Sequence, residues 1–579
     1  MSSRSTPFLA RAVPAAQTAL RRMLRPDIGA AILVAFLLGL PILSVLAQGL
    51  LPAGRGASWQ TAEIGRATVN SLTLGALVTL MSTTLAVPLA VIAERTPLGR
   101  IPGWDILWVI PFTAPPYLTS MGWILATEPA GGYLSPWLAT VPFLSRALFS
   151  SVGLAWIIAL HLFPVMYLGL RQRIRMVGKE TTEAARVHGL SVWKRLIRID
   201  APLWLPAAAV TGTIVFVKTL GEFGAPLIFG SLIHFPVLTT QIYEDVTSWP
   251  VNFPLAARLA SILFAAGLAV WWLRERYALR HQYALVSGRS GCGRPRRSPW
   301  GLATAIVAGL FVLFVLTNAL VLPLGSILWT SLLRVPGRGW GWANLTLRHY
   351  GELLAGGRAM HALVTTFELA LASAGIATGL AWVLACIARF YPTPWSRWTD
   401  YLALVPNTVP DILPVIGLIL LWNAPWMPFP LYDTKGMLVL SFVVLFLPFA
   451  LSYLSQGFRS LSPTLWEAAR VHGLGRRWLL GRLFLPLLAP AALAGAVTVF
   501  AVSFRDLVVP MLISPPNVQL VSTYIYGQFN QGSLPRGMAM ACADILVVTA
   551  SYAAAQRAPG HRRETARPAG DVVPPVARR

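Results

Sequence analysis

Long apolar stretches alternate with short polar segments along almost the whole chain. Twelve stretches have about the length, roughly 20 residues, that a helix needs to cross a bilayer. They lie near residues 28–50, 68–93, 104–127, 148–170, 203–231, 256–273, 301–331, 362–387, 400–423, 436–457, 484–513 and 538–555. The pattern predicts an all-α polytopic membrane protein with twelve transmembrane helices, six in each half of the chain.

Composition and charge support this fold class. Hydrophobic residues make up 55% of the chain and charged residues 12%, too little polar surface for an ordinary soluble domain. The net charge of +25 is unevenly spread: the two ends and every second loop hold 35 Lys and Arg, and the other loops hold 9. This is the positive-inside pattern, so we expect both termini in the cytoplasm and no nucleic acid partner.

A polar segment of 25 residues occurs twice, at 183–207 and at 467–491. Fourteen positions are identical without a gap, and the first eight of these are consecutive. Both copies lie in basic loops, and six predicted spans separate them. Because six is an even number, the two halves have the same orientation and are parallel repeats.

The repeat extends into the spans. The residues Pro111, Thr113, Pro115, Leu118 and Gly122 align with Pro406, Thr408, Pro410, Leu413 and Gly417. We therefore divide the chain into a tail (1–27), a first repeat (28–273), a basic linker (274–300), a second repeat (301–555) and a basic tail (556–579). The linker is rich in Arg, Gly and Ser, which is typical of a flexible connection.

The third and ninth spans contain several prolines, among them Pro115 and Pro410. Proline removes a backbone donor and clashes with the preceding turn, so these spans should be kinked or broken. In a membrane, the freed carbonyls must face protein or water. A kink that only improves packing and a wall of a translocation pathway are both consistent with this pattern, and we take Pro115 and Pro410 as pathway candidates.

Each repeated polar segment is predicted to form a short helix, a glycine and a second helix that re-enters the membrane. Ser462 is placed to cap the helix of the second copy, and Gly473 to end it in the left-handed conformation. Gly189 occupies the matching place in the first copy. We define the coupling segments as residues 178–207 and 462–491.

The sequence EAA followed by a glycine resembles the coupling-helix motif of binding-protein-dependent ABC importer permeases. Its double occurrence resembles the fused two-domain permeases of the ferric-iron importer type. The resemblance implies a type I importer permease fold in a bacterial inner membrane, two copies of a separate ATPase subunit, and a periplasmic or lipoprotein-anchored binding protein. It implies that the coupling residues are Glu183, Ala184, Ala185, Gly189, Glu467, Ala468, Ala469 and Gly473.

The resemblance favours ferric iron as the substrate and leaves thiamine, 2-aminoethylphosphonate and polyamine-type solutes open. The chain has no GxxxxGK[ST] phosphate loop, so ATP should be used by the partner subunit and not by this chain. We expect no bound cofactor, no resident metal and no catalytic site. His188 and His472 also repeat, but their place beside the helix-ending glycines favours packing over metal binding.

Charged residues follow each coupling segment at membrane depth and are candidates for the translocation pathway: Lys218 and Glu222 in the first half, Arg505 and Asp506 in the second. Lys218 and Glu222 are four residues apart and can form an ion pair on one helix face. Such residues usually face the bundle interior or water. Glu222 and Asp506 are equivalent by the repeat, so they are candidates for two carboxylates across a cation pathway. Alternatively, these residues stabilise the halves against each other near the outer interface.

Two other classes of protein remain possible at this stage. A secondary transporter or channel with internal repeats would use an ion gradient and need no ATPase. A transporter-like sensor would bind the same partners without moving solute.

Overall fold

The computed structural model describes residues 26–50, 57–176, 185, 187–280, 302–338, 341–390, 393–394, 410–462, 464–465, 471–475 and 478–557. Every regular element within them is a helix, apart from an isolated bridge between Leu333 and Leu345.

The elements of the first half are α2 (Pro26–Val34), η1 (Ala35–Gly39), α3 (Leu40–Gly49), α4 (Ala57–Arg95), η2 (Pro97–Arg100), α5 (Trp104–Thr113), α6 (Pro116–Thr127), α7 (Ser135–Ala139), α8 (Pro142–Leu148), α9 (Ser151–Met176), α11 (Val192–Arg195), η3 (Leu196–Asp200), α12 (Ala201–Leu220), η4 (Pro226–Gly230), α13 (Leu238–Thr247) and α14 (Phe253–Arg280). Those of the second half are α15 (Leu302–Leu316), η5 (Thr317–Val321), α16 (Leu322–Leu332), η6 (Trp342–Asn344), α17 (Arg348–Leu354), α18 (Gly357–Phe390), α20 (Ile412–Trp422), α21 (Lys435–Ser460), η8 (Leu479–Phe484), α24 (Leu485–Phe504), α25 (Val508–Ile513), α26 (Val521–Gln531) and α27 (Leu534–Arg557).

The described residues contain 10 helices long and apolar enough to cross a membrane. They match ten of the twelve predicted spans. The third span, expected at 104–127, is instead two shorter helices, α5 and α6, separated at Ala114, whose backbone is extended. Of the ninth span, expected at 400–423, the structure describes Pro410 onward, with the short apolar helix α20. The count of twelve is therefore not confirmed, whereas the predicted break at the prolines of the third span is.

The two halves are built alike. In the first half α4, α9 and α12 pack against one another, and in the second half α18, α21 and α24 do the same. The halves also exchange helices: α3 of the first half packs on α20 of the second, and α16 of the second packs on α6 of the first. Since each half lends a helix to the other, the halves interlock.

Two glycines permit these exchanged contacts. A Cβ atom on Gly122 of α6 would overlap the backbone carbonyl of Pro323 in α16, and one on Gly417 of α20 would overlap that of Pro41 in α3. Ser44 strengthens the second crossing by donating a hydrogen bond to the Gly417 carbonyl, at 3.2 Å. The aligned glycines seen in the sequence are therefore sites of close backbone approach.

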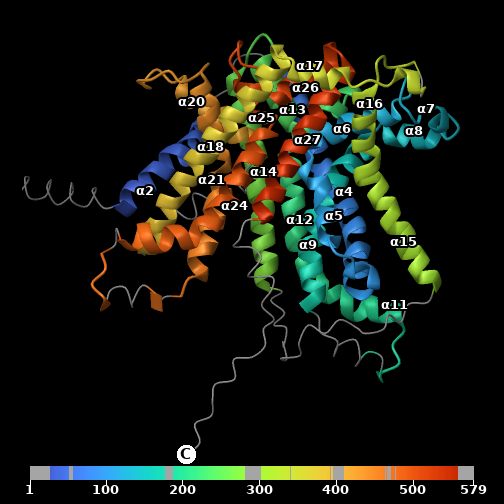
Figure 1. Ribbon diagram of the computed structural model, residues 1–579, viewed down its shortest axis with the longest axis horizontal. Coiled ribbons are helices and arrows are strands. Elements are labelled where there is room, and N and C mark those ends of the chain that lie inside the picture. Colours follow the sequence, from blue (N-terminus) through green and yellow to red (C-terminus); the bar gives the residue numbers. More distant parts are fainter. Residues whose placement is uncertain are drawn as a thin grey trace, which may run out of the picture.

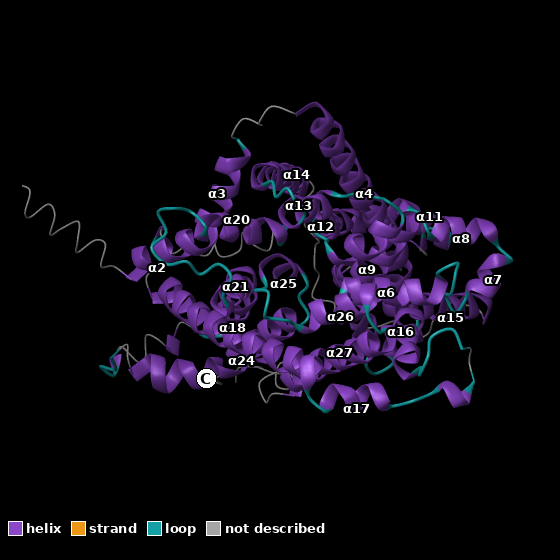
Figure 2. Cartoon of the chain, turned by 90° about the horizontal axis from the view of Figure 1, so that it is seen from above, coloured by secondary structure: helices purple, strands orange, loops and turns teal. Residues whose placement is uncertain are grey.

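The molecule has two distinct ends. Figure 1 shows α11 and the described residues between α21 and α24, drawn in orange, at the lower end, and α13, α17, α25 and α26 at the upper end. Seen from above (Figure 2), α13 and α14 lie on one side of the upper end, and α17 and α26 lie on the other. The described residues of both coupling segments are thus at the same end of the protein.

Candidate functional site

The two coupling segments share one backbone conformation. Gly189 has φ +68° and Gly473 has φ +69°, the left-handed conformation that the sequence predicts for both. In the first coupling segment, the Leu190 N–H donates to the Ala185 carbonyl at 3.0 Å. Of the two hydrogen bonds that define a Schellman helix end, this is the one that spans more residues. A residue with a Cβ pays strain in this conformation, so glycine fixes the direction in which the chain leaves each helix.

The predicted cap of the second coupling segment is also present. The Thr464 N–H donates to the Ser462 hydroxyl at 3.3 Å, so Ser462 satisfies a backbone donor of the first turn. His188 and His472 are exposed beside the glycines. Ala185 is buried, with 3% of its surface exposed. The other predicted coupling residues, Glu183, Ala184, Glu467, Ala468 and Ala469, lie outside the described residues.

A second polar cluster lies where the third span is broken. Pro115 and Pro116 lack the N–H groups that would bond the carbonyls of Pro111 and Phe112 in a continuous helix. His161 of α9 bonds the Pro111 carbonyl through Nδ1 at 3.3 Å. Arg505 Nη1 donates to the carbonyl of Phe112 at 2.8 Å.

The same Arg505 nitrogen donates to the Thr113 carbonyl at 2.6 Å. Arg505 belongs to the second half and its acceptors to the first, so the guanidinium joins the halves at the break. Buried carbonyls need such partners because an unpaired one costs free energy. Arg505, predicted as a pathway candidate, therefore has a clear structural contact.

The corresponding place in the second half is built differently. By the repeat, Gly221 corresponds to Arg505 and Asp411 to Pro116. A methyl group on Gly221 would lie 3.1 Å from Cα of Pro410, so the backbones of the two halves approach closely here. Asp411 is exposed and lies within electrostatic range of Lys218, which is also exposed. In the described residues, Gly221 and Pro410 make a close backbone contact at the position where Arg505 bonds the broken third span in the other half.

Glu222 and Asp506 occupy equivalent positions, as the sequence predicts. Glu222 Oε1 accepts hydrogen bonds from the N–H groups of Gly224 (3.1 Å) and Ala225 (3.4 Å). Asp506 Oδ2 accepts one from Val509 N at 2.8 Å. Each carboxylate thus satisfies backbone donors at the start of the helical segment that follows it: Asp506 bonds the first turn of α25, and Glu222 bonds the two residues immediately before η4. Both side chains are partly exposed.

The predicted ion pair between Lys218 and Glu222 is not formed, because no salt bridge within 4.0 Å joins them in the structure. Lys218 instead acts electrostatically on both Glu222 and Asp411. Asp411 also acts on Asp506. Among the described residues no group of three His, Cys, Asp or Glu is arranged to hold a metal ion.

Sequence reasoning missed a buried acid, Asp544 of α27. It is 0% exposed, and neither carboxylate oxygen has a hydrogen-bond partner among the described residues. Its charge acts on Tyr117 of α6, whose hydroxyl is likewise buried without a partner. The signal was a single acid inside the last apolar span, a position at which a charge is costly and usually functional.

Comparisons with known proteins agree with this geometry. Residues 377–558 match the family described as binding-protein-dependent transport system inner membrane component. A Haemophilus influenzae protein described as a ferric transport system permease, FbpB 1, is 28% identical over 452 residues, covering 76% of this chain and 68% of the relative. The ferric transport system permease protein FbpB of Actinobacillus pleuropneumoniae is 26% identical over 84% of this chain and 69% of the relative.

A shorter relative matches a smaller part of the chain at slightly higher identity. A Streptomyces antibioticus protein described as an ABC transporter permease, ORF1, is 30% identical over 198 residues, which cover 34% of this chain and 85% of the relative.

Proposed function

Since this chain belongs to the binding-protein-dependent transport system inner membrane components, the permeases of ABC importers, we propose that it supplies both membrane halves of a ferric iron importer. It is a multi-pass inner membrane protein and a component of a transporter. The observation that carries the proposal is that the described residues of both coupling segments lie at one end of the molecule, and that each segment contains a glycine in the left-handed conformation.

Two copies of a separate ATPase subunit bind these segments in the proposed mechanism, one copy at each. ATP binding draws the two subunits together, and the helix on either side of Gly189 or Gly473 carries that movement into the spans. The interlocked helices α3 and α16 join the halves, so a movement at one segment reaches both. Both termini are cytoplasmic in this arrangement, in line with the charge distribution.

Ferric iron is supported by the names of two relatives that cover most of the chain. The chemistry of the centre is consistent with a hard cation, which prefers oxygen ligands. Asp411 lies within electrostatic range of both Glu222 and Asp506, so carboxylates from three separate segments approach this region. An extracytoplasmic binding protein would deliver the substrate to this region.

The test is ATP-driven uptake of radioactive ferric iron into proteoliposomes that contain this chain, its ATPase and its binding protein. We expect uptake to require ATP on the side of the membrane where the ATPase is bound. Putrescine, thiamine or 2-aminoethylphosphonate should not reduce it. Uptake driven by an ion gradient without ATP would favour a secondary transporter. ATP hydrolysis that the binding protein stimulates without solute accumulation would favour a sensor.

The double variant Glu222→Gln with Asp506→Asn tests the pathway residues. The amide oxygens can still accept the capping hydrogen bonds, so the short helices should remain while the two charges are lost. We expect uptake to be abolished and ATPase assembly to be retained. The matched double variant to alanine removes charge and caps together; if only this variant loses uptake, the two residues are structural caps and not part of the pathway.

A further inference from the structure

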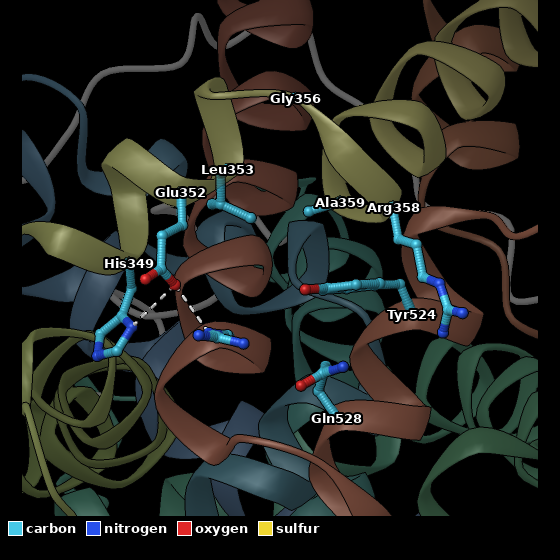
Figure 3. Close-up of a pocket in the computed structure, with 9 residues that line it drawn as sticks. His349, Glu352, Leu353, Gly356, Arg358, Ala359, Tyr524 and Gln528 are labelled. Atoms are coloured by element: carbon cyan, nitrogen blue, oxygen red, sulfur yellow. Dashed lines mark ion pairs between the residues drawn. The ribbon is translucent and has the colours of Figure 1, made fainter.

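A pocket opens at the upper end of the second half, away from the coupling segments. Its volume is about 450 Å³, and it is formed by α17, the first turn of α18, α26 and the start of α27. Figure 3 shows the side chains of Glu352, Tyr524 and Gln528 directed into one space, with Arg358 beside it. The functions assigned to the coupling segments and to the centre do not use this pocket.

The only carboxylate among the pocket-lining residues is already neutralised. Glu352 accepts from Nε of Arg348 at 2.8 Å and pairs with Nε of Arg536 at 2.8 Å. Partial burial alone would raise the pKa of Glu352, but its hydrogen bond and ion pairs with Arg348 and Arg536 outweigh burial and lower that pKa. Arg358 is exposed and has no carboxylate within ion-pair distance in the described part of the chain. The pocket therefore has an excess of positive charge.

Two further features favour an anionic group in this pocket. The 34-residue helix α18 begins at Gly357, and the pocket is lined by residues of its first turn, where free N–H groups carry partial positive charge. His349 is 8% exposed; its Nε2 bonds the Leu333 carbonyl at 3.0 Å, which leaves Nδ1 without a hydrogen bond. This Nδ1 lies 3.9 Å from Oε2 of Glu352, and it lines the pocket together with the helix end and the guanidinium groups.

The first half carries the opposite charge at the equivalent place. Glu244 and Asp245 of α13 correspond to Gly527 and Gln528 of α26, because the segments that contain them align. Glu63 of α4 lies close enough to act electrostatically on both acids. We call Glu63, Glu244 and Asp245 the acidic lip; it lies on the side of α13 in Figure 2, and the pocket lies on the side of α17 and α26.

We propose that the upper end is a docking surface for the extracytoplasmic binding protein, and that its charges select one orientation of that protein. The pocket binds a carboxylate side chain from an acidic patch of the binding protein, and the acidic lip contacts a basic patch. This inference rests on the proposed function, which supplies the partner. A partner that contacts both halves of a two-fold repeat can dock in two orientations related by a half-turn. Opposite charges at equivalent positions favour one of them, since charge complementarity steers association and rejects the mismatched orientation.

Docking is measured with this chain and its ATPase in nanodiscs, as the binding-protein concentration that gives half-maximal stimulation of ATP hydrolysis. Arg358→Glu should raise that concentration about tenfold at low salt and much less at high salt, because it places a charge of the wrong sign at the pocket. Arg358 is exposed and unpaired, so folding and basal hydrolysis should not change. The matched control is Arg146→Glu on α8, which lies apart from α17 in both views; it makes the same charge change and should have little effect.

Orientation is read directly by photo-crosslinking. A photoreactive amino acid replaces Trp249, 92% exposed beside the acidic lip, or Leu347, 70% exposed beside α17. We expect each position to crosslink to one peptide of the binding protein, different for the two positions. If both positions crosslink to both peptides, the surface does not select one orientation and the proposal is wrong.

The remaining outcomes separate the proposal from its premise. If wild-type hydrolysis is not stimulated by the binding protein, the proposed function fails. If stimulation is normal but Arg358→Glu and Arg146→Glu behave alike, the docking proposal alone fails. If inorganic phosphate binds the wild-type complex, and Arg358→Glu abolishes that binding without changing docking, the pocket is a free-anion site and the docking proposal is again wrong.

Discussion

The halves of this protein meet symmetrically at the exchanged helices and asymmetrically at the broken span. Gly122 against Pro323 and Gly417 against Pro41 are the same contact made twice. At the centre, Arg505 bonds the carbonyls freed near Pro116, whereas Gly221 packs on the backbone of Pro410.

The difference is explained by paired substitutions. Where a second proline frees a carbonyl, at Pro116, the facing position holds an arginine that can satisfy it. At the equivalent place the sequence has Asp411, which keeps its N–H, and the facing position is Gly221. The contacts that assemble the halves therefore follow the repeat, whereas the region that we propose as the translocation pathway departs from it.

The largest effects should come from the symmetric contacts. Gly122→Ala and Gly417→Ala each place a methyl group against a backbone carbonyl that cannot move aside, so overpacking should cost about 1–3 kcal/mol or more. We expect each variant to lower the yield of monodisperse protein severely and to the same degree. Gly379→Ala is the control, since nothing lies within 4 Å of its Cβ. Normal yield of either variant would mean that the exchanged helices do not pack this closely.

Arg505→Ala should have the next largest effect. It leaves the carbonyls of Phe112 and Thr113 without a partner, at a cost of about 1–3 kcal/mol, measured as a lower thermal midpoint and slower uptake. Pro116→Ala restores an N–H at the break, so the double variant should lose less than the sum of the single losses. Strict additivity would show that Arg505 does not act through the broken span.

The coupling glycines should show smaller and equal effects. Gly189→Ala and Gly473→Ala each force a residue with a Cβ into the left-handed conformation, which costs about 1–2 kcal/mol. We expect each to reduce stimulated ATP hydrolysis several-fold, with the control Gly475→Ala near wild type, since Gly475 has no positive φ and an open Cβ position. A strong effect at one glycine and none at the other would contradict equivalent coupling.

The smallest expected effect is a pH dependence of docking at the acidic lip. Burial, reinforced by Glu244 and Glu63 against a hydrogen bond from Gln241, raises the pKa of Asp245 to about 6. This carboxyl is charged above that pH and neutral below it, so lowering the pH from 7.5 to 5.5 should weaken docking of a basic patch about twofold. Asp245→Asn should remove this dependence. The Arg358→Gln variant should keep the pH dependence of docking. If the Asp245→Asn variant also keeps it, another group is responsible.

Much of the fold could be predicted from the sequence, because period, length and repetition are properties of the residues themselves. The left-handed Gly189 and Gly473, the cap at Ser462 and the break at Pro115 all follow from local backbone chemistry. The exchange of helices between the halves could not be predicted from the sequence, although the aligned glycines Gly122 and Gly417 lie where it occurs. Close approach of two helices depends on tertiary packing, which a single aligned glycine does not specify.

The candidate site was predicted less completely. The sequence placed Glu222 and Asp506 in equivalent positions but suggested an ion pair for Glu222 with Lys218, and the structure shows helix capping. The Arg505 contact needs a partner from the other half, and the pocket at Arg358 gathers four helices. Both are long-range arrangements. Asp544 is different, since one acid in an apolar span is visible from sequence alone.

The most direct test of the central claim is crosslinking of the ATPase to both coupling segments. Single cysteines replace His188 and His472, which are exposed beside the two glycines. In the assembled complex we predict that each cysteine crosslinks to an ATPase subunit, and that the double variant carries two subunits per chain. Crosslinking at only one position, or labelling of either cysteine from the extracytoplasmic side, would contradict a permease with two equivalent coupling segments.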